Sequence, residues 1–88
     1  MVGYLYMWKV YILRSKIKRW YYVGSTNDIS RRIGEHDSGK VRSTASFRPL
    51  ELVYTEDFNT EVEARNRERQ IKGRRIEKER IIAEVEKK

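Results

Sequence analysis

The chain has 88 residues, a formal net charge of +7 and no cysteine. This length suits one domain, so we expect residues 1–88 to form a single folded unit. Without cysteine the chain can form neither disulfide bonds nor a cysteine-based zinc site. No stretch approaches the roughly 20 apolar residues of a membrane span, and the N-terminus lacks the charged-then-apolar pattern of a signal peptide. We therefore expect a cytoplasmic protein without a membrane partner.

The charge is unevenly distributed along the chain. Residues 1–50 hold ten Lys or Arg against three acidic residues, residues 51–64 hold five acidic residues and no base, and residues 65–88 hold ten bases against five acidic residues. A basic surface of this size is expected of a protein that binds a polyanion. A solvated surface laced with salt bridges would have the same composition. Charge alone leaves both interpretations open and does not separate DNA from RNA or anionic lipid.

Two apolar segments that carry tyrosines open the chain. Residues 5–13 are almost continuously apolar, as in a strand that is covered on both faces. Residues 20–24 predict a second strand, and the basic turn at 14–19 joins the two as a hairpin. Tyr11 and Tyr22 should therefore lie on neighbouring strands.

A helix and a loop follow the hairpin. Asn27 or Asp28 is placed to cap a helix over residues 29–37, and Gly39 is placed to end it. Residues 40–49 predict a polar, basic loop.

A third strand is predicted over residues 50–55, from alternating apolar residues. Three residues are expected on one of its faces: Leu50, Leu52 and Tyr54. The sequence after it, Thr60-Glu61-Val62-Glu63, fits a capping box that starts a helix ending near Lys72, and residues 74–86 predict a last helix. The order β-β-α-β-α-α predicts an α+β fold with a three-stranded, mostly antiparallel sheet flanked by helices.

Glu68 lies on the inward stripe of the helix that starts at Thr60. It follows Ala64 by four residues and precedes Ile71 by three. A carboxylate on the buried side of a helix is costly unless it is paired or coordinated. An ion pair with one of the many arginines and a metal ion are the two interpretations.

Arg32 and His36 lie four residues apart and share one helical face. On a polar helix this spacing is most often without function. An arginine can also grip two phosphate oxygens, and a histidine can exchange a proton near neutral pH.

Along the chain, the two tyrosine segments are followed by Arg32, His36 and Glu68. This order resembles the GIY-YIG nuclease family, and most closely its small stand-alone members. Lys9-Val10-Tyr11 stands in place of Gly-Ile-Tyr, and Tyr22-Val23-Gly24 stands in place of Tyr-Ile-Gly. The resemblance covers about residues 8–73, with residues 74–86 as a C-terminal helix. It departs from the family pattern at Lys9, which replaces the first glycine, and the late asparagine of many larger members has no clear counterpart.

The resemblance implies a metal-dependent endonuclease that hydrolyses DNA, probes nucleic-acid structure rather than sequence, and acts in repair or recombination. The catalytic residues that it implies are Tyr11, Tyr22, Arg32, His36 and Glu68. In the family mechanism Glu68 would anchor Mg²⁺ or Mn²⁺, Tyr11 would help to deprotonate the attacking water with Tyr22 nearby, and Arg32 would stabilise the charge on phosphorus. Packing alone would also explain the two tyrosines.

Seven further residues are expected to contact the nucleic-acid backbone: Lys40, Arg42, Thr44, Arg48, Lys72, Arg74 and Arg75. DNA is the expected partner, and RNA remains open. A non-catalytic nucleic-acid-binding module of the same fold is the alternative function, and a small basic protein that docks to an acidic protein is a third. The enzyme is favoured because all five chemical positions hold usable residues.

Overall fold

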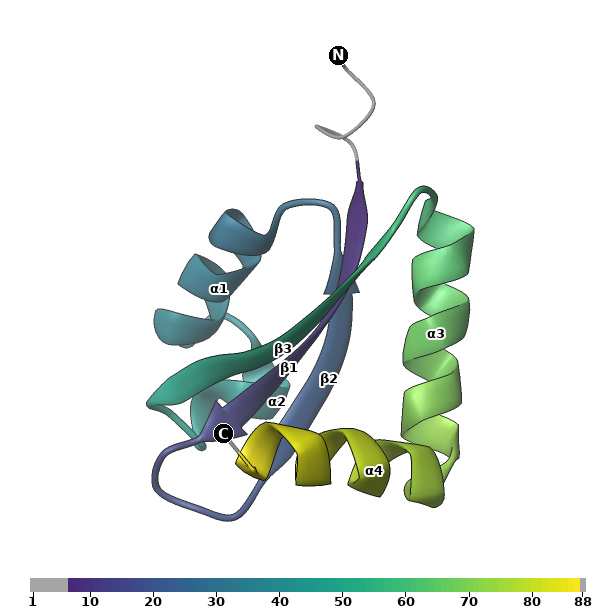
Figure 1. Ribbon diagram of the computed structural model, residues 1–88. Helices are drawn as coiled ribbons and strands as arrows, with labels where there is room; N and C mark the ends of the chain where they lie inside the picture. The colour runs from purple at the N-terminus through teal and green to yellow at the C-terminus, as the bar shows by residue number, and fades with distance from the viewer. Residues whose placement is uncertain (1–6, 88) are drawn as a thin grey trace.

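The computed structural model of the protein describes residues 7–87. One antiparallel sheet has the strand order β2-β1-β3. The strands are β1 (Trp8–Ser15), β2 (Tyr21–Thr26) and β3 (Leu50–Phe58). The helices within residues 7–87 are α1 (Ile29–Asp37), α2 (Arg42–Ala45), α3 (Glu61–Gly73) and α4 (Arg75–Glu86). The predicted α+β fold is confirmed, with α2 as an addition (Figure 1).

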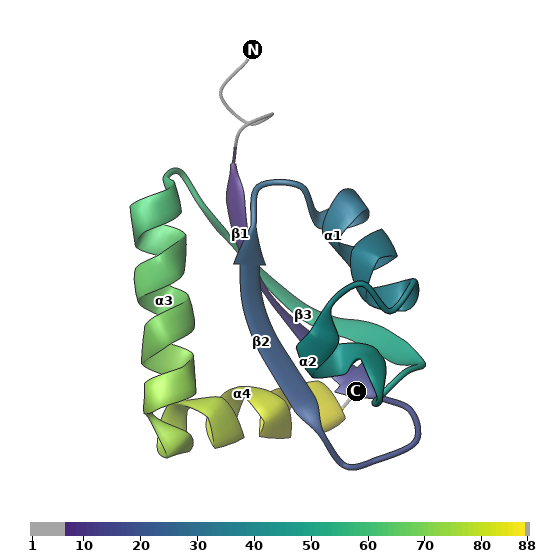
Figure 2. The same cartoon turned by 180° about the vertical axis from the view of Figure 1, so that it is seen from behind.

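The central strand β1 is buried on both faces, as its continuous apolar sequence predicts. Residues 10–13 are at most 1% exposed. Val10 and Ile12 belong to the main apolar cluster, together with Val23, Ala64, Ile71 and Ile81 from β2, α3 and α4. On the opposite face Tyr11 contacts His36 of α1. Figures 1 and 2 show α1 and α2 on one side of the sheet and α3 on the other.

The ends of α1 follow the predicted capping chemistry. The Asp28 carboxylate accepts a hydrogen bond from the Arg31 backbone N–H at 3.1 Å, so Asp28 is the N-cap. Gly39 follows the helix with φ +83°, a left-handed conformation that a residue without a Cβ adopts readily. The backbone N–H groups of Gly39 and Lys40 close the helix end on carbonyls of α1 at 3.1 and 3.0 Å.

Helix α3 begins at the predicted cap. The Thr60 hydroxyl accepts a hydrogen bond from the Glu63 backbone N–H at 3.2 Å. The return bond differs from a capping box, because the Thr60 hydroxyl and not its backbone N–H donates to the Glu63 carboxylate, at 3.1 Å. The chain leaves helical geometry at Arg74, which separates α3 from α4.

The prediction that Leu50, Leu52 and Tyr54 share one face of β3 is wrong, because β3 carries an irregularity opposite the middle of β1 that places Tyr54 on the other face. Ile12 pairs with Tyr54 whereas Leu13 pairs with Leu52, so one residue of β3, Val53, has no partner in β1. The inward alternation is thereby shifted. Val53 and Tyr54 both pack on the core, and Leu52 is 42% exposed.

The predicted loop at residues 40–49 contains a single helical turn, α2. This turn brings Thr44 into the interior, where it is 0% exposed. A four-residue helix shows no 3.6-residue periodicity, so the sequence pattern could not indicate it. None of the helices between residues 7 and 87 has the length and apolar character needed to cross a bilayer.

Candidate active site

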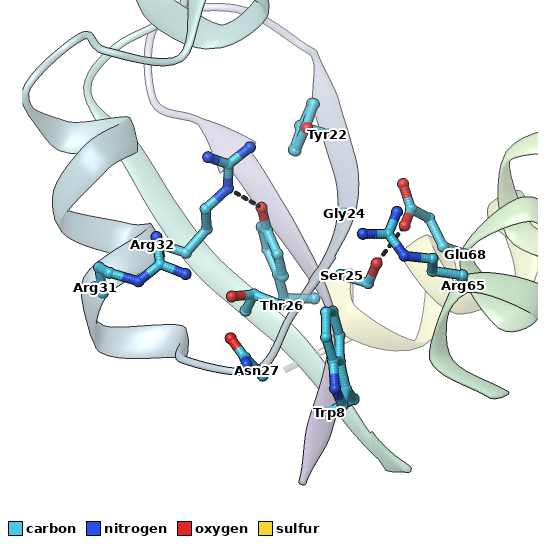
Figure 3. A pocket seen from close by; sticks show the side chains of 11 residues that line it. Trp8, Tyr22, Gly24, Ser25, Thr26, Asn27, Arg31, Arg32, Arg65 and Glu68 are labelled. Atoms are coloured by element: carbon cyan, nitrogen blue, oxygen red, sulfur yellow. Dashed lines mark hydrogen bonds between the residues drawn. The ribbon is translucent and has the colours of Figure 1, made fainter. Parts of the chain in front are cut away.

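An open, polar cavity of about 300 Å³ lies beside the edge strand β2, between α1 and α3 (Figure 3). Four of the predicted catalytic residues line it: Tyr11, Tyr22, Arg32 and Glu68. They come from β1, β2, α1 and α3, so the fold assembles them from separate parts of the chain. Successive residues of a strand point to opposite faces of the sheet, so β2 contributes side chains to the cavity from both of its faces.

Gly24 makes room for the Tyr11 ring. The two residues are paired across β1 and β2. A Cβ at position 24 would lie 2.6 Å from the Tyr11 hydroxyl oxygen and 2.9 Å from a ring carbon of Tyr22. The last glycine of the Tyr22-Val23-Gly24 segment is therefore needed because two tyrosine rings pass over it.

A buried chain of hydrogen bonds runs from Tyr11 into the interior. The Tyr11 hydroxyl lies 2.9 Å from His36 Nε2, and His36 Nδ1 lies 2.8 Å from the Thr44 hydroxyl. The Thr44 hydroxyl in turn donates to the Val41 carbonyl at 3.3 Å. Thr44 therefore accepts from His36 Nδ1–H, which leaves Nε2 as the acceptor of the Tyr11 proton.

The surroundings keep both Tyr11 and His36 neutral. Burial raises the pKa of Tyr11 to about 12, against a smaller lowering by the hydrogen bond from Arg32. Burial and the charge of Arg32 lower the pKa of His36 below its ordinary value. His36 is 0% exposed, so it cannot touch a phosphate in this conformation and can act only through Tyr11.

The Glu35 carboxylate, on the same helix, holds the Arg32 side chain next to Tyr11. Its Nε lies 3.4 Å from the Tyr11 hydroxyl, and its Nη1 donates to Glu35 at 2.8 Å. The other Glu35 oxygen accepts from Arg31, also at 2.8 Å. The Glu35 carboxylate, followed by Tyr11, raises the pKa of Arg32, which therefore stays cationic. Glu35 holds two arginines at the cavity, a role that the sequence did not indicate.

Glu68 reaches the cavity from α3, between the fully buried Ala64 and Ile71, as its inward position predicts. Its side chain is 18% exposed. One carboxylate oxygen accepts from the Ser25 hydroxyl at 2.5 Å, and the other accepts from Lys72 at 2.7 Å. Burial raises the pKa of Glu68, but the hydrogen bonds from Lys72 and Ser25 outweigh it, so the net pKa is lowered and the group is an anion.

Comparison with known proteins identifies the family. The GIY-YIG catalytic domain matches residues 7–80. The chain belongs to the GIY-YIG family. This is a family of nucleases, as the resemblance predicted.

Three GIY-YIG relatives show how far the similarity extends. A UPF0213 protein of Natronomonas pharaonis is 42% identical over 65 residues, which are 72% of this chain and 76% of the relative. A UPF0213 protein of Staphylococcus saprophyticus is 39% identical over 77 residues, which are 85% of this chain and 93% of the relative. The solution NMR structure of a UPF0213 protein from Bacillus halodurans is 37% identical, with a TM-score of 0.55, and the match covers 88% of this chain and 83% of that one. Small single-domain proteins of the GIY-YIG family thus share this fold.

The donor set of this GIY-YIG chain suits a hydrated divalent ion. Within residues 7–87 no three His, Asp or Glu side chains converge on one point, so Glu68 would be the lone anionic ligand. Its two oxygens offer about four acceptor positions, of which Ser25 and Lys72 take two. Mg²⁺ keeps most of its waters and binds through one or two carboxylates and a phosphate, which fits an open, polar cavity. The residues present are compatible with such an ion.

Three cavity residues were missed in the sequence. Arg31 and Arg65 bring positive charge to the cavity from α1 and α3, and Trp8 lines it from β1 (Figure 3). The Arg65 guanidinium lies 5.6 Å from the centre of the Trp8 ring. The spacing of Arg65, three residues before Glu68 on the same helix, could have indicated that its side chain lies beside Glu68.

The residues expected to contact the nucleic-acid backbone lie in several different places. Thr44 is a correction, because it is fully buried and supports His36, and so it cannot touch a ligand directly. Arg48 is partly engaged in holding the chain after α1, through bonds to the Ala45 and Asp37 carbonyls. Lys72 adjoins the cavity through Glu68. The remaining four stay predictions: Lys40, Arg42, Arg74 and Arg75.

Proposed function

We propose that the protein is a metal-dependent endonuclease that hydrolyses DNA phosphodiester bonds, recognises the structure of its substrate and serves repair or recombination. The observation that carries the proposal is the convergence of Tyr11, Tyr22, Arg32 and Glu68 on one open cavity. Two tyrosine hydroxyls, an arginine and a carboxylate can supply three functions that favour hydrolysis of a phosphodiester: a route for the proton of water, a stabiliser of negative charge and an anchor for a cation.

The proton of the attacking water would leave through Tyr11. As a free phenolate, Tyr11 would be rare at neutral pH, since its pKa is about 12. A free phenolate is not needed, because the Tyr11 hydroxyl lies 2.9 Å from His36 Nε2. When the water gives a proton to the Tyr11 oxygen, the Tyr11 proton can pass to His36 Nε2, so the imidazole is the final acceptor and Tyr11 the relay. Thr44 keeps His36 in the required tautomer.

The new P–O bond forms to the water oxygen as the bond to the leaving sugar oxygen breaks, and the leaving oxygen takes a proton from solvent. Arg32 is placed to bind the phosphoryl oxygens while the charge on them grows, because Glu35 and Tyr11 already fix its guanidinium. A divalent ion held at Glu68 would act as a Lewis acid on the phosphate. Arg31 and Arg65 add positive potential on the two sides of the cavity.

The direct test is incubation of the purified protein with single-stranded, duplex and branched DNA in Mg²⁺, Mn²⁺ or EDTA. We expect cleavage that EDTA abolishes. Glu68→Gln keeps the size of the side chain but removes the charge, so cleavage should fall by at least ~100-fold while DNA binding persists. Arg32→Ala should weaken both, since the guanidinium would touch phosphate in the ground state as well. Glu84→Gln, on the exposed side of α4, is the matched control and should cleave like the wild type.

Equal cleavage by Glu68→Gln and wild type, in preparations free of contaminating nuclease, would reduce Glu68 to a partner of Lys72 and Ser25. DNA binding without cleavage of any of these substrates would refute the nuclease and support the non-catalytic binding module.

A further inference from the structure

A second groove is lined by residues of α4 and by residues at the beginning of β2. Its volume is about 590 Å³, larger than the catalytic cavity, and in the range of sites that hold small planar ligands. Its lining combines an aromatic ring, an apolar stretch of α4 and three cations: Trp20, Ile82, Ala83, Arg19, Arg75 and Lys78. The proposed nuclease mechanism uses none of these side chains.

Trp20 is held rigidly at this groove. Its ring stacks on Phe47, with ring centroids 3.8 Å apart and planes at 7°. Lys18 lies 5.5 Å from the centre of the Phe47 ring and covers that part of the stack. Trp20 nevertheless remains half-buried and lines the groove. A fixed aromatic side chain loses little entropy on binding, and its π-face accepts any nucleobase.

The acidic groups of the groove are already engaged. Glu79 is paired with Arg75 at 2.8 Å. Glu86 accepts a hydrogen bond from the Tyr21 hydroxyl. Arg75 compensates the charge of Glu79, and the three cations that line the groove exceed its two carboxylates by one.

Two cations of the groove are available to a ligand. Neither Arg19 nor Lys78 forms an ion pair with any residue between 7 and 87. The groove thus offers an aromatic side chain beside two cations that have no ion-pair partner among the described residues, and these match the base and the phosphate of a nucleotide.

The groove lies along the same edge strand as the catalytic cavity, since Trp20 and Tyr21 line the groove and Tyr22 and Gly24 line the cavity. The Trp20 ring is next to that of Tyr22, with centroids 6.3 Å apart, and Tyr22 lines the cavity. At ~3.3 Å per residue, the four steps from Trp20 to Gly24 along the edge of the sheet span ~13 Å. This is close enough for one nucleic-acid strand to occupy both places.

From these observations we infer that the groove binds an unpaired nucleotide of the strand whose phosphate occupies the catalytic cavity. Its base would lie against Trp20, and its phosphate would be held by Arg19 and Lys78. The inference rests on the proposed function and narrows the substrate to DNA with a single-stranded segment beside the cleaved bond. A base-paired nucleotide is stacked between its neighbours and cannot place its face on Trp20.

The test is equilibrium binding in EDTA, where no cleavage occurs, of a fluorescent oligothymidine and of a blunt duplex with the same number of phosphates. Stacking of one base on an aromatic ring contributes ~1–3 kcal/mol, so Trp20→Ala should weaken oligothymidine binding by at least ~5-fold. Duplex binding should change by less than ~2-fold, because a paired base does not use the ring. Trp20→Phe, which keeps an aromatic face, should restore most of the single-strand affinity.

A charge-matched pair of variants provides an independent measurement. Lys78→Glu should weaken oligothymidine binding clearly more than Lys16→Glu, which makes the same charge change on the hairpin turn outside the groove. If circular dichroism shows that Trp20→Ala is unfolded, this pair decides the matter.

The inference is overturned if Trp20→Ala binds oligothymidine as the wild type does, if it loses single-strand and duplex affinity equally, or if Lys78→Glu and Lys16→Glu behave alike. Failure of the groove and failure of the nuclease are distinguishable, because binding is measured without turnover. A protein that cleaves but shows any of these results refutes the groove alone. A protein that binds as described but cleaves nothing refutes the nuclease alone.

Discussion

Replacing Gly24 with alanine should displace the Tyr11 hydroxyl from its place in the site. The added Cβ would lie 2.6 Å from the Tyr11 hydroxyl oxygen, 2.7 Å from its Cζ and 2.9 Å from a ring carbon of Tyr22. Carbon atoms in ordinary contact are ~3.5–4.0 Å apart, so the rings must retreat by ~1 Å. Tyr11 is 0% exposed and held by His36 at 2.9 Å, which leaves it no open space.

The cost follows from this geometry. Forcing one carbon into a packed interior costs ~1–3 kcal/mol. For a chain of this size each kcal/mol lowers Tm by ~4–8 °C, so we expect a decrease of ~4–24 °C. A shift of ~1 Å also disrupts the proton route from Tyr11 to His36, and misplacement on this scale lowers catalytic rates by ~100-fold.

The assay pairs thermal unfolding with the cleavage rate and includes Gly34→Ala as the control. Gly34 lies inside α1, and a Cβ there would have no heavy atom within 4 Å. Alanine should therefore stabilise the protein by ~0.5–1 kcal/mol through its higher helix propensity, without loss of cleavage. Wild-type stability and cleavage in Gly24→Ala would refute the packing argument. A loss of equal size in Gly34→Ala would show that the effect is not specific to the tyrosines.

Three further predictions concern pH, salt and metal. The pKa of Tyr11 is about 12 in the folded protein and 10.0 for an unperturbed tyrosine, so between these pH values the unfolded chain has lost a proton that the folded chain keeps. The contribution of Tyr11 to the free energy of unfolding is therefore fully present below pH ~10, and it falls by ~2–3 kcal/mol as the pH rises toward ~12. Tyr11→Phe should make this decrease smaller in urea titrations, and an unchanged pH dependence would contradict the prediction. Duplex DNA affinity should fall with salt with a log–log slope of roughly −4 to −7, for about four to eight phosphate contacts, and a flat response would exclude the basic surface from binding. Lys72→Met should tighten Mn²⁺ binding by ~2–5-fold in spin-resonance titrations compared with Lys78→Met, because an ion pair worth ~0.5–1 kcal/mol no longer competes for Glu68; equal affinities would show that Lys72 does not compete.

The sequence alone determined the helices and strands of this fold, and it determined which side of α3 faces inward. Apolar alternation and periodicity, Asp28 and Thr60 as caps, and Gly39 as a stop located the long helices and the three strands within a few residues. The inward position of Glu68 followed from its spacing to Ala64 and Ile71. These features depend on residues at most four positions apart, which interact in the same way wherever the segment lies.

Only the tertiary structure decided how the site is held together. His36 meets Tyr11 across 25 positions of sequence, and Ser25 meets Glu68 across 43. Thr44 was predicted to face nucleic acid, but α2 turns it inward to become the partner of His36. Such contacts depend on which segments pack against each other and on the exact register of β1, β2 and β3, and no local pattern of residue types records that information. The residue type therefore gives the chemistry of each side chain, whereas its protonation state and the groups that it can contact depend on the neighbours that folding brings to it.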